Sequence, residues 1–202
     1  MISKFTDIGV SEEVSRAMED MGWDDPTPIQ TAAIPVGLEG SDMFAQAQTG
    51  TGKTGVYASI ILGRIAAGEE IPASIILAPT RELANQVTEE INKISKYSGH
   101  EAVAIYGGAS IEGQIARLHQ GCDIVAGTPG RVKDMILRGA LNLTEIEIVV
   151  LDEADRMLDM GFIEDIEFIL SSMPKERQTL LFSATMPEGV KRLAFDYMRK
   201  PK

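Results

Sequence analysis

Short apolar runs alternate with longer stretches of mixed polarity along most of the chain. The runs predict β-strands over residues 42–45, 73–78, 102–106, 123–126, 147–151 and 179–182. The run at 147–151 is the most apolar and the richest in β-branched residues, which is typical of a central strand buried on both faces.

The stretches between these runs carry helical spacing and helix-boundary residues. They predict helices over residues 11–21, 28–40, 81–98, 111–120, 154–160 and 162–173, with further helices opening near Gly52, near Gly130 and at Pro187. The helix over residues 28–40 is expected to bend at Pro35. Because strands and helices alternate without an evident linker, we expect one α/β domain over residues 1–202. Its central sheet should be mostly parallel, with helices on both faces.

Composition narrows the class of protein. With 202 residues, of which 44% are hydrophobic, the chain can bury a sizeable core. No apolar run approaches the ~18 residues of a membrane helix and no secretory signal is evident, so we expect no membrane partner. Cys122 is the single cysteine, which excludes a disulfide within the chain and favours a cytoplasmic location. We interpret it as a buried structural thiol.

Charge gives only a weak indication of the partner. The net charge of −11 argues mildly against nucleic acid, because phosphate contacts need Lys and Arg. Net charge says little about a local patch, however. From Lys191 to the end the charged residues are basic except Asp196, and a solvated helix face explains them as well as a ligand does.

One loop carries the clearest chemistry. It follows the run at 42–45 and consists of Ala47, Gln48, Thr49, Gly50, Thr51, Gly52, Lys53 and Thr54. The loop fits the phosphate-binding pattern G-x-x-x-x-G-K-[ST], with Ala47 in place of the first glycine. Gly50 and Gly52 allow successive N–H groups to turn toward a polyphosphate. Lys53 can reach its terminal phosphates, and the Thr54 hydroxyl can ligate Mg²⁺. The alternative is a Gly/Thr-rich connection with a surface lysine. The strand–loop–helix context favours nucleotide binding.

Two adjacent acids follow the apolar run at 147–151. Asp152 can hold Mg²⁺ through water, and Glu153 is placed to orient or deprotonate an attacking water. An activated water is useful for hydrolysis and harmful in a kinase, so the pair favours hydrolysis over transfer to a metabolite. For Asp155, capping of the next helix is a real alternative.

Motifs throughout the chain match those of one family in the right order. They are Phe5 with Gly22 and Pro26–Gln30, Ala47–Thr54, Pro79–Ala84, Gly107-Gly108, Thr128–Arg131, Asp152–Asp155 and Ser183–Thr185. The chain therefore resembles the DEAD-box RNA helicases of superfamily two. The resemblance implies an N-terminal RecA-like P-loop NTPase domain, with residues 1–31 as the adenine-sensing Q-motif segment.

The resemblance also implies roles at the nucleotide site. Gln30 would hydrogen-bond the adenine amino edge, Phe5 would stack on the base, and Thr27 would join the site. The loop from Ala47 to Thr54 would hold the phosphates of ATP. Thr54 and Asp152 would hold Mg²⁺, partly through water. The implied catalytic residues are Glu153, Lys53 and Asp152.

RNA contacts are implied for a second set of residues. They are Pro79, Thr80, Arg81, Gly108, Thr128, Gly130 and Arg131. Contacts to phosphate and 2′-OH recognise RNA as a class and carry little sequence information. Asp155, Ser183 and Thr185 would couple the ATP site to RNA, with Ser183 bonded to Asp155.

Members of the family carry a second RecA-like domain, which nothing in this chain matches. A missing arginine finger is worth ~10³–10⁵ in rate in comparable phosphoryl-transfer enzymes. We therefore expect this chain to be a monomeric lobe cut at the interdomain linker, which binds nucleotide weakly, hydrolyses ATP very slowly and unwinds nothing alone.

Two other functions remain open. One is a nucleotide-dependent RNA-binding or regulatory module without turnover, which the missing second lobe motivates. The other is a different phosphate-loop NTPase, such as a DNA translocase or a small-molecule kinase. Gln30, Phe5 and the Asp-Glu-Ala-Asp run argue against the latter.

Overall fold

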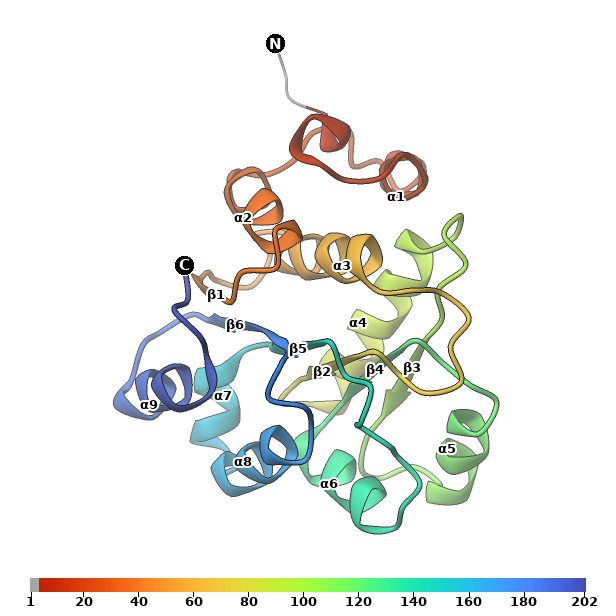
Figure 1. Cartoon of the computed structure of the whole chain (residues 1–202), viewed down its shortest axis with the longest axis vertical. Coiled ribbons are helices and arrows are strands. Elements are labelled where there is room, and N and C mark those ends of the chain that lie inside the picture. The colour runs from red at the N-terminus through yellow and green to blue at the C-terminus, as the bar shows by residue number, and fades with distance from the viewer. Residues whose placement is uncertain (1–3) are drawn as a thin grey trace.

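A six-stranded sheet forms the centre of the molecule in the computed structural model, which describes residues 4–202 (Figure 1). The strand order is β1-β6-β5-β2-β4-β3, and each neighbouring pair is parallel. The strands are β1 (Met43–Gln46), β2 (Ser74–Leu77), β3 (Ala102–Ile105), β4 (Ile124–Gly127), β5 (Ile148–Leu151) and β6 (Gln178–Ser183). The expected α/β fold is confirmed, and the sheet is wholly parallel over the described residues rather than mostly so.

Helices connect the strands and precede the first one. They are the 3-10 helix η1 (Phe5–Ile8) and the α-helices α1 (Glu12–Asp20), α2 (Pro28–Leu38), α3 (Lys53–Arg64), α4 (Arg81–Ile94), α5 (Ile111–Leu118), α6 (Pro129–Leu137), α7 (Ala154–Asp159), α8 (Ile163–Ser171) and α9 (Glu188–Tyr197). The predicted end of α4 was too late, because the chain tightens after Ile94 and Ser98 N–H bonds to Ser95 O at 3.0 Å. The predicted start of α9 was one residue early, because Pro187 is its extended N-cap.

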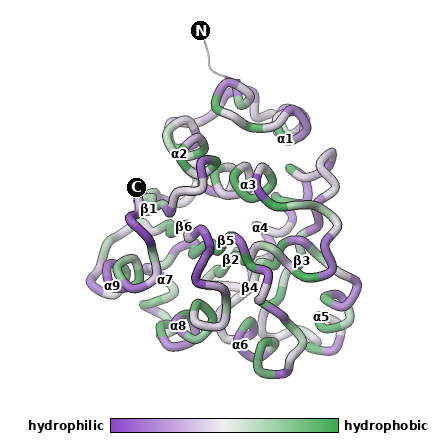
Figure 2. The backbone as a smooth tube through the Cα atoms, viewed as in Figure 1, coloured by the Kyte–Doolittle hydropathy of each residue, from purple (hydrophilic) through white to green (hydrophobic). Residues whose placement is uncertain are grey.

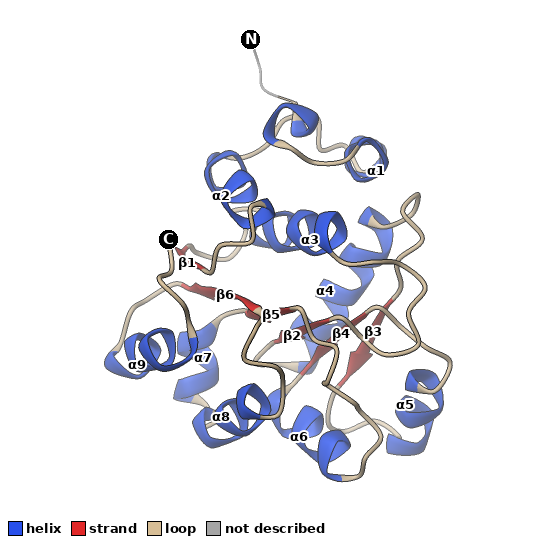
Figure 3. Ribbon diagram, viewed as in Figure 1, coloured by secondary structure: helices blue, strands red, loops and turns tan. Residues whose placement is uncertain are grey.

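The two faces of the sheet are covered by different helices (Figure 3). On β5, Ile148 and Val150 pack into the hydrophobic cluster shared with α1, α2, α3 and α4. Val149 and Leu151 face the opposite way, into the cluster shared with α5 through α9. This alternation follows from the two-residue period of a strand. Figure 2 shows the hydrophobic positions gathered in the strands between these layers. The expected helices on both faces are confirmed.

Parallel strands direct all their carboxyl ends to one edge of the sheet. The loop after β1 is the glycine-bearing loop, and the loops after β2, β4 and β5 begin at Ala78, Thr128 and Asp152. Each predicted motif from residue 47 onward therefore leaves the sheet on the same side. Ligands of open α/β sheets bind outside this edge, so the fold itself gathers the candidate site there.

The burial of Cys122 and the length and apolarity of the helices can also be compared with the sequence. Cys122 is buried at 3% exposure, as expected of a structural thiol, and burial raises its pKa to about 11. Within residues 4–202, no helix is both long and apolar enough to cross a membrane.

Gly127, at the end of β4, tests the packing that positions the site. A Cβ on Gly127 would lie 2.8 Å from the Ile105 backbone oxygen and 2.7 Å from Val132 Cγ2. Backbone cannot move aside cheaply, so we expect Gly127→Ala to destabilise the protein by about 1–3 kcal/mol in urea unfolding.

Gly107→Ala is the matched control, because a Cβ there would meet no atom of the described residues within 4 Å. Its unfolding midpoint should stay close to that of the wild type. Equal midpoints for the two variants would show that the carboxyl edge is more loosely packed than the structure indicates.

Candidate functional site

A cleft of about 590 Å³ opens at the carboxyl edge of the sheet. Its walls come from four segments that are distant in sequence. They are the segment before α2 together with its first turn (Gly22, Trp23, Asp24, Asp25, Thr27 and Gln30), the loop and first turn of α3 (Thr49, Gly50, Gly52, Lys53 and Thr54), α4 (Leu83, Gln86 and Glu90) and the segment after β5 (Asp152 and Glu153). Most of the residues predicted for nucleotide binding are thus brought together.

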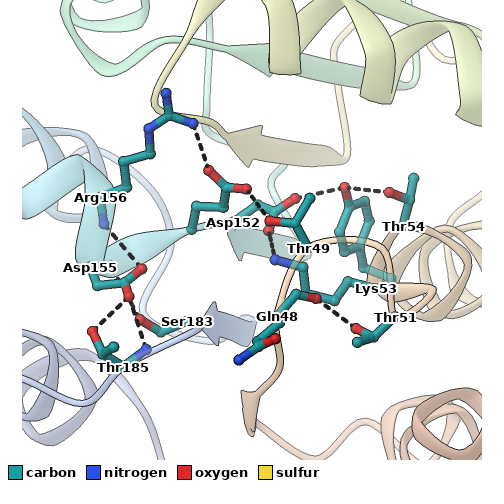
Figure 4. Close-up of polar contacts among 12 residues, drawn as sticks. Gln48, Thr49, Thr51, Lys53, Thr54, Asp152, Asp155, Arg156, Ser183 and Thr185 are labelled. Carbon is teal, nitrogen blue, oxygen red and sulfur yellow. Dashed lines mark hydrogen bonds and ion pairs between the residues drawn. The ribbon is translucent and has the colours of Figure 1, made fainter.

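The glycine-bearing loop has the backbone geometry that its sequence predicts. Gly50 and Gly52 have φ of +84° and +94°, a left-handed conformation that residues with a Cβ rarely adopt. The Thr51 hydroxyl closes the loop by donating to Gln48 O at 2.8 Å (Figure 4). Ala47 N–H donates to Ser183 O at 3.0 Å. Ala47 thus continues the pairing of β1 with β6, a position that needs no glycine.

Lys53 and Asp152 form a buried ion pair at the base of the cleft. Lys53 Nζ lies 3.3 Å from Asp152 Oδ1, and the two side chains are 7% and 3% exposed. The Tyr57 hydroxyl donates to Asp152 Oδ2 at 3.0 Å and lies 3.4 Å from Thr54 Oγ1. Burial raises the pKa of Asp152, and the Lys53 charge opposes that shift. Burial also raises the pKa of Tyr57 well above its ordinary value, so the hydroxyl remains a donor.

The surroundings of Asp152 fit a divalent cation. Oδ1 of Asp152 is buried and finds no hydrogen-bond partner among residues 4–202, although the Lys53 ammonium is near. The same part of the chain contains no group of three or more His, Cys, Asp or Glu side chains arranged around a metal position. An ion at Asp152 and Thr54 would therefore need further oxygen ligands from outside the protein. Mg²⁺ usually takes these from phosphate and water.

Glu153 is held in a strained conformation facing the loop. Its φ of 51° and ψ of 50° place a residue with a side chain in the left-handed region, which costs of order 1 kcal/mol. Its carboxylate accepts from Thr49 Oγ1 at 3.1 Å and from Arg156 Nη1 at 3.2 Å. These two bonds hold the Glu153 carboxylate beside the glycine-bearing loop.

Asp155 joins the end of β5 to the segment after β6. Thr185 donates to Asp155 Oδ2 through its N–H at 2.9 Å and its hydroxyl at 2.7 Å (Figure 4). The predicted bond between Ser183 and Asp155 is present, with Ser183 Oγ accepting from the Asp155 backbone N–H at 3.2 Å. Although burial acts to raise the pKa of Asp155, the two bonds from Thr185 are the main cause of a pKa below its ordinary value.

Gln30 fixes the segment before α2 to the glycine-bearing loop. Its Oε1 accepts from Thr27 N–H at 2.8 Å, and its Nε2 donates to Gly52 O at 3.2 Å. Thr27 Oγ1 donates to Thr51 O at 3.0 Å. A side-chain amide has two donors and two acceptor lone pairs, so each polar atom of Gln30 retains capacity for a further bond. Gln30 therefore links the wall of the cleft to the glycine-bearing loop.

Phe5 does not occupy the place that was expected of it. It is 1% exposed and packs in the cluster that contains Met18 and Ile34. The prediction that Phe5 stacks on a base is therefore wrong, because its ring has no accessible face. Trp23 lines the cleft instead and is half-buried. As the single tryptophan, placed just before Pro26, it carried a signal that we overlooked.

The residues predicted to contact RNA divide into two groups. Arg81, Gly108 and Gly130 are exposed, and Arg131 is half-buried nearby, with Arg131 donating to Ala109 O at 3.3 Å. The other three residues are either buried or cap the N-terminus of a helix. Pro79 is buried, Thr80 caps α4 by accepting from Leu83 N–H at 3.2 Å, and Thr128 is the N-cap of α6.

Comparison with proteins of known sequence reveals close relatives. The chain is 48% identical over 201 residues to the DEAD-box ATP-dependent RNA helicase CshA of Geobacillus kaustophilus. It is 47% identical to the ATP-dependent RNA helicase CshA of Listeria monocytogenes. Each alignment covers 100% of this chain but only 43% and 39% of the relative. The chain thus spans about two fifths of the length of these proteins.

Solved structures give the same result for the fold. A DEAD box protein from Methanococcus jannaschii superposes with a TM-score of 0.91 and 41% identity, covering 98% of this chain and 55% of that one. A hypothetical ATP-dependent RNA helicase from Sulfolobus tokodaii superposes with a TM-score of 0.88 and 38% identity, covering 95% of this chain and 56% of that one. The domain is therefore RecA-like. Because the DEAD/DEAH box helicase family model matches residues 27–193, on top of these likenesses, the chain belongs to the DEAD/DEAH box helicase family.

Proposed function

We propose that the chain is the ATP-binding and ATP-hydrolysing N-terminal lobe of a DEAD-box RNA helicase. The observation that carries this proposal is the convergence of Lys53, Asp152 and Gln30 on one cleft. The names of the relatives, ATP-dependent RNA helicases, support the same substrate pair. The complete protein would use ATP to clamp RNA and separate duplexes locally.

ATP fits the cleft by its charge and by its base. The phosphates would lie on the loop from Gln48 to Thr54, at the N-terminus of α3, where unpaired N–H groups and the helix dipole favour anions. Lys53 would contact the terminal phosphates, and Thr54 and Asp152 would hold Mg²⁺, which neutralises phosphate charge when bound. Gln30 would read the adenine edge. Trp23 offers an aromatic surface in the same cleft.

Hydrolysis needs a carboxylate near the terminal phosphate. Glu153 is held next to Thr49 of the loop, and its carboxylate can orient an attacking water or accept its proton. Asp155, through its two bonds from Thr185, links this strand end to the segment after β6. That link would carry the state of the nucleotide site to the RNA contacts.

RNA would lie across the loops that follow β2, β3 and β4. Arg81, Gly108, Gly130 and Arg131 would contact the sugar-phosphate backbone, which would give binding without sequence preference. The relatives extend well beyond the matched region. We expect strand separation to require a second RecA-like domain, as the resemblance to the family implies. We expect the lobe alone to be monomeric and nearly inactive. We also propose a cytoplasmic location, on the ground of the single, buried Cys122.

Nucleotide binding is tested by titrating ATP, ADP and GTP with Mg²⁺ in a calorimeter. Lys53→Ala removes a charge-assisted phosphate contact and is expected to weaken ATP binding about 10–100-fold. Gln30→Ala should reduce the preference of the cleft for ATP over GTP. Equal affinity for ATP and GTP in the wild type would contradict the adenine-reading role of Gln30.

Tyr57→Phe tests the environment of Asp152. The change leaves a buried carboxylate oxygen without its donor, so we expect a loss of about 1.5–3 kcal/mol in the free energy of unfolding at neutral pH. The Tyr57 bond lowers the pKa of Asp152, so its loss should raise that pKa further. The difference between variant and wild type should therefore narrow as the pH falls and Asp152 becomes protonated.

The matched control is Tyr97→Phe, which removes an exposed bond from a tyrosine hydroxyl to Asp20. Solvent can replace that bond, so the control should lose much less stability. Similar losses in the two variants would show that Asp152 does not depend on Tyr57.

A further inference from the structure

Gln114 lies at the centre of a polar network between two arginines of the proposed RNA interface. Arg81 begins α4 after β2, and Arg131 lies in α6 after β4. Because β4 pairs with both β2 and β3, the loops after these three strands are adjacent. Gln114 comes from α5, which follows the paired glycines after β3, and it is half-buried.

The Gln114 amide binds the backbone of Tyr106 with both of its polar atoms. Oε1 accepts from Tyr106 N–H at 3.2 Å, and Nε2 donates to Tyr106 O at 3.0 Å. Tyr106 follows the last residue of β3, the edge strand of the sheet. The amide thus acts there as a neighbouring peptide group would in a sheet, and it fixes where the glycine turn begins.

The same amide also contacts Arg131. Oε1 of Gln114 accepts from Arg131 Nη1 at 3.2 Å, so its two lone pairs serve Tyr106 and Arg131. Arg131 in turn donates from both Nη1 and Nη2 to Ala109 O, each at 3.3 Å. The guanidinium is therefore anchored on one side by neutral acceptors, which leaves its charge uncompensated within these contacts.

Arg81 is positioned through Tyr106. Its guanidinium carbon lies 4.9 Å from the centre of the Tyr106 ring, within the range of a cation–π contact. A Cβ added to Gly108 would lie 3.9 Å from Arg81 Nη1, so the two residues are close neighbours. Tyr106 thus receives its backbone position from Gln114 and presents its ring to Arg81.

We propose that Gln114 is a positioning residue of the RNA interface, which holds Arg131 directly and Arg81 through Tyr106 in the arrangement that contacts the RNA backbone. This inference rests on the proposed RNA binding. Neutrality is part of the role, because a carboxylate in this place would pair with Arg131 and cancel the charge that attracts phosphate.

The test measures binding of fluorescein-labelled oligouridylate to the 202-residue chain by anisotropy, at several salt concentrations. We expect Gln114→Ala to weaken binding about tenfold, and Gln114→Glu to weaken it at least as much although it keeps the acceptor bonds. Gln120→Ala is the control, because Gln120 is exposed in the turn after α5 and accepts only from Arg117 among the described contacts. It should bind as the wild type does.

A double-mutant cycle separates positioning from general stability. In an Arg131→Ala background, Gln114→Ala should cost much less than in the wild type, because much of its effect passes through Arg131. Hydrogen exchange at the Tyr106 amide should accelerate in Gln114→Ala but not in Gln120→Ala, and this readout needs no RNA.

Three results would overturn the inference while RNA binding by the wild type stands. They are unchanged affinity in Gln114→Ala, the same fold-loss in both backgrounds of the cycle, and unchanged exchange at the Tyr106 amide. Failure of the wild type to bind the oligonucleotide at low salt would instead contradict the proposed RNA interface, and the inference would fall with it.

Discussion

The ion pair between Lys53 and Asp152 connects the glycine-bearing loop to the strand end that carries the Asp-Glu-Ala-Asp run. Both side chains are almost fully buried, and Asp152 Oδ1 makes no hydrogen bond to residues 4–202. Desolvation of two charges can cost as much as their attraction returns, so such a pair is weak evidence of a stabilising role. The presence of this ion pair despite that cost is explained if Lys53 and Asp152 each have another use. The proposed use is the phosphate for Lys53 and the metal for Asp152.

The sheet determines how this pair is surrounded. All strands are parallel, so the loops that carry the motifs leave one edge, and the cleft lies where the loops after β1 and β5 approach α2 and α4. The hydroxyl of Tyr57, in α3, donates a hydrogen bond to Asp152. Glu153 keeps a strained backbone against Thr49. The site is therefore built by residues from several segments at the carboxyl edge of the sheet.

Much of this arrangement could be predicted from the sequence. Alternating apolar runs gave the strands nearly to the residue, because a strand buried on both faces must be apolar throughout. The phosphate loop was evident because its spacing and its place between strand and helix are both required. Helix ends were less certain, as at Ile94, because the chain continues in tight turns that share helical hydrogen-bond spacing.

Contacts between distant segments could not be predicted in the same way. The choice between Phe5 and Trp23 depends on which ring the core absorbs, and only the packing of η1 against α1 and α2 decides it. The motif predicts a bond between Ser183 and Asp155, but only the structure shows that Ser183 Oγ accepts it from the Asp155 backbone N–H. Gln114 matches no motif that we identified, and its role depends on three loops meeting at one edge.

Under the proposed function, nucleotide binding would separate Lys53 from Asp152 and give each a new partner. A crystal structure of the chain with Mg²⁺ and a non-hydrolysable ATP analogue tests it most directly. We expect that Lys53 Nζ will contact a terminal phosphate oxygen, that Asp152 will face the Mg²⁺ ion, and that the adenine will lie at Gln30. A nucleotide bound elsewhere, or bound in the cleft with the Lys53–Asp152 pair unchanged, would contradict it.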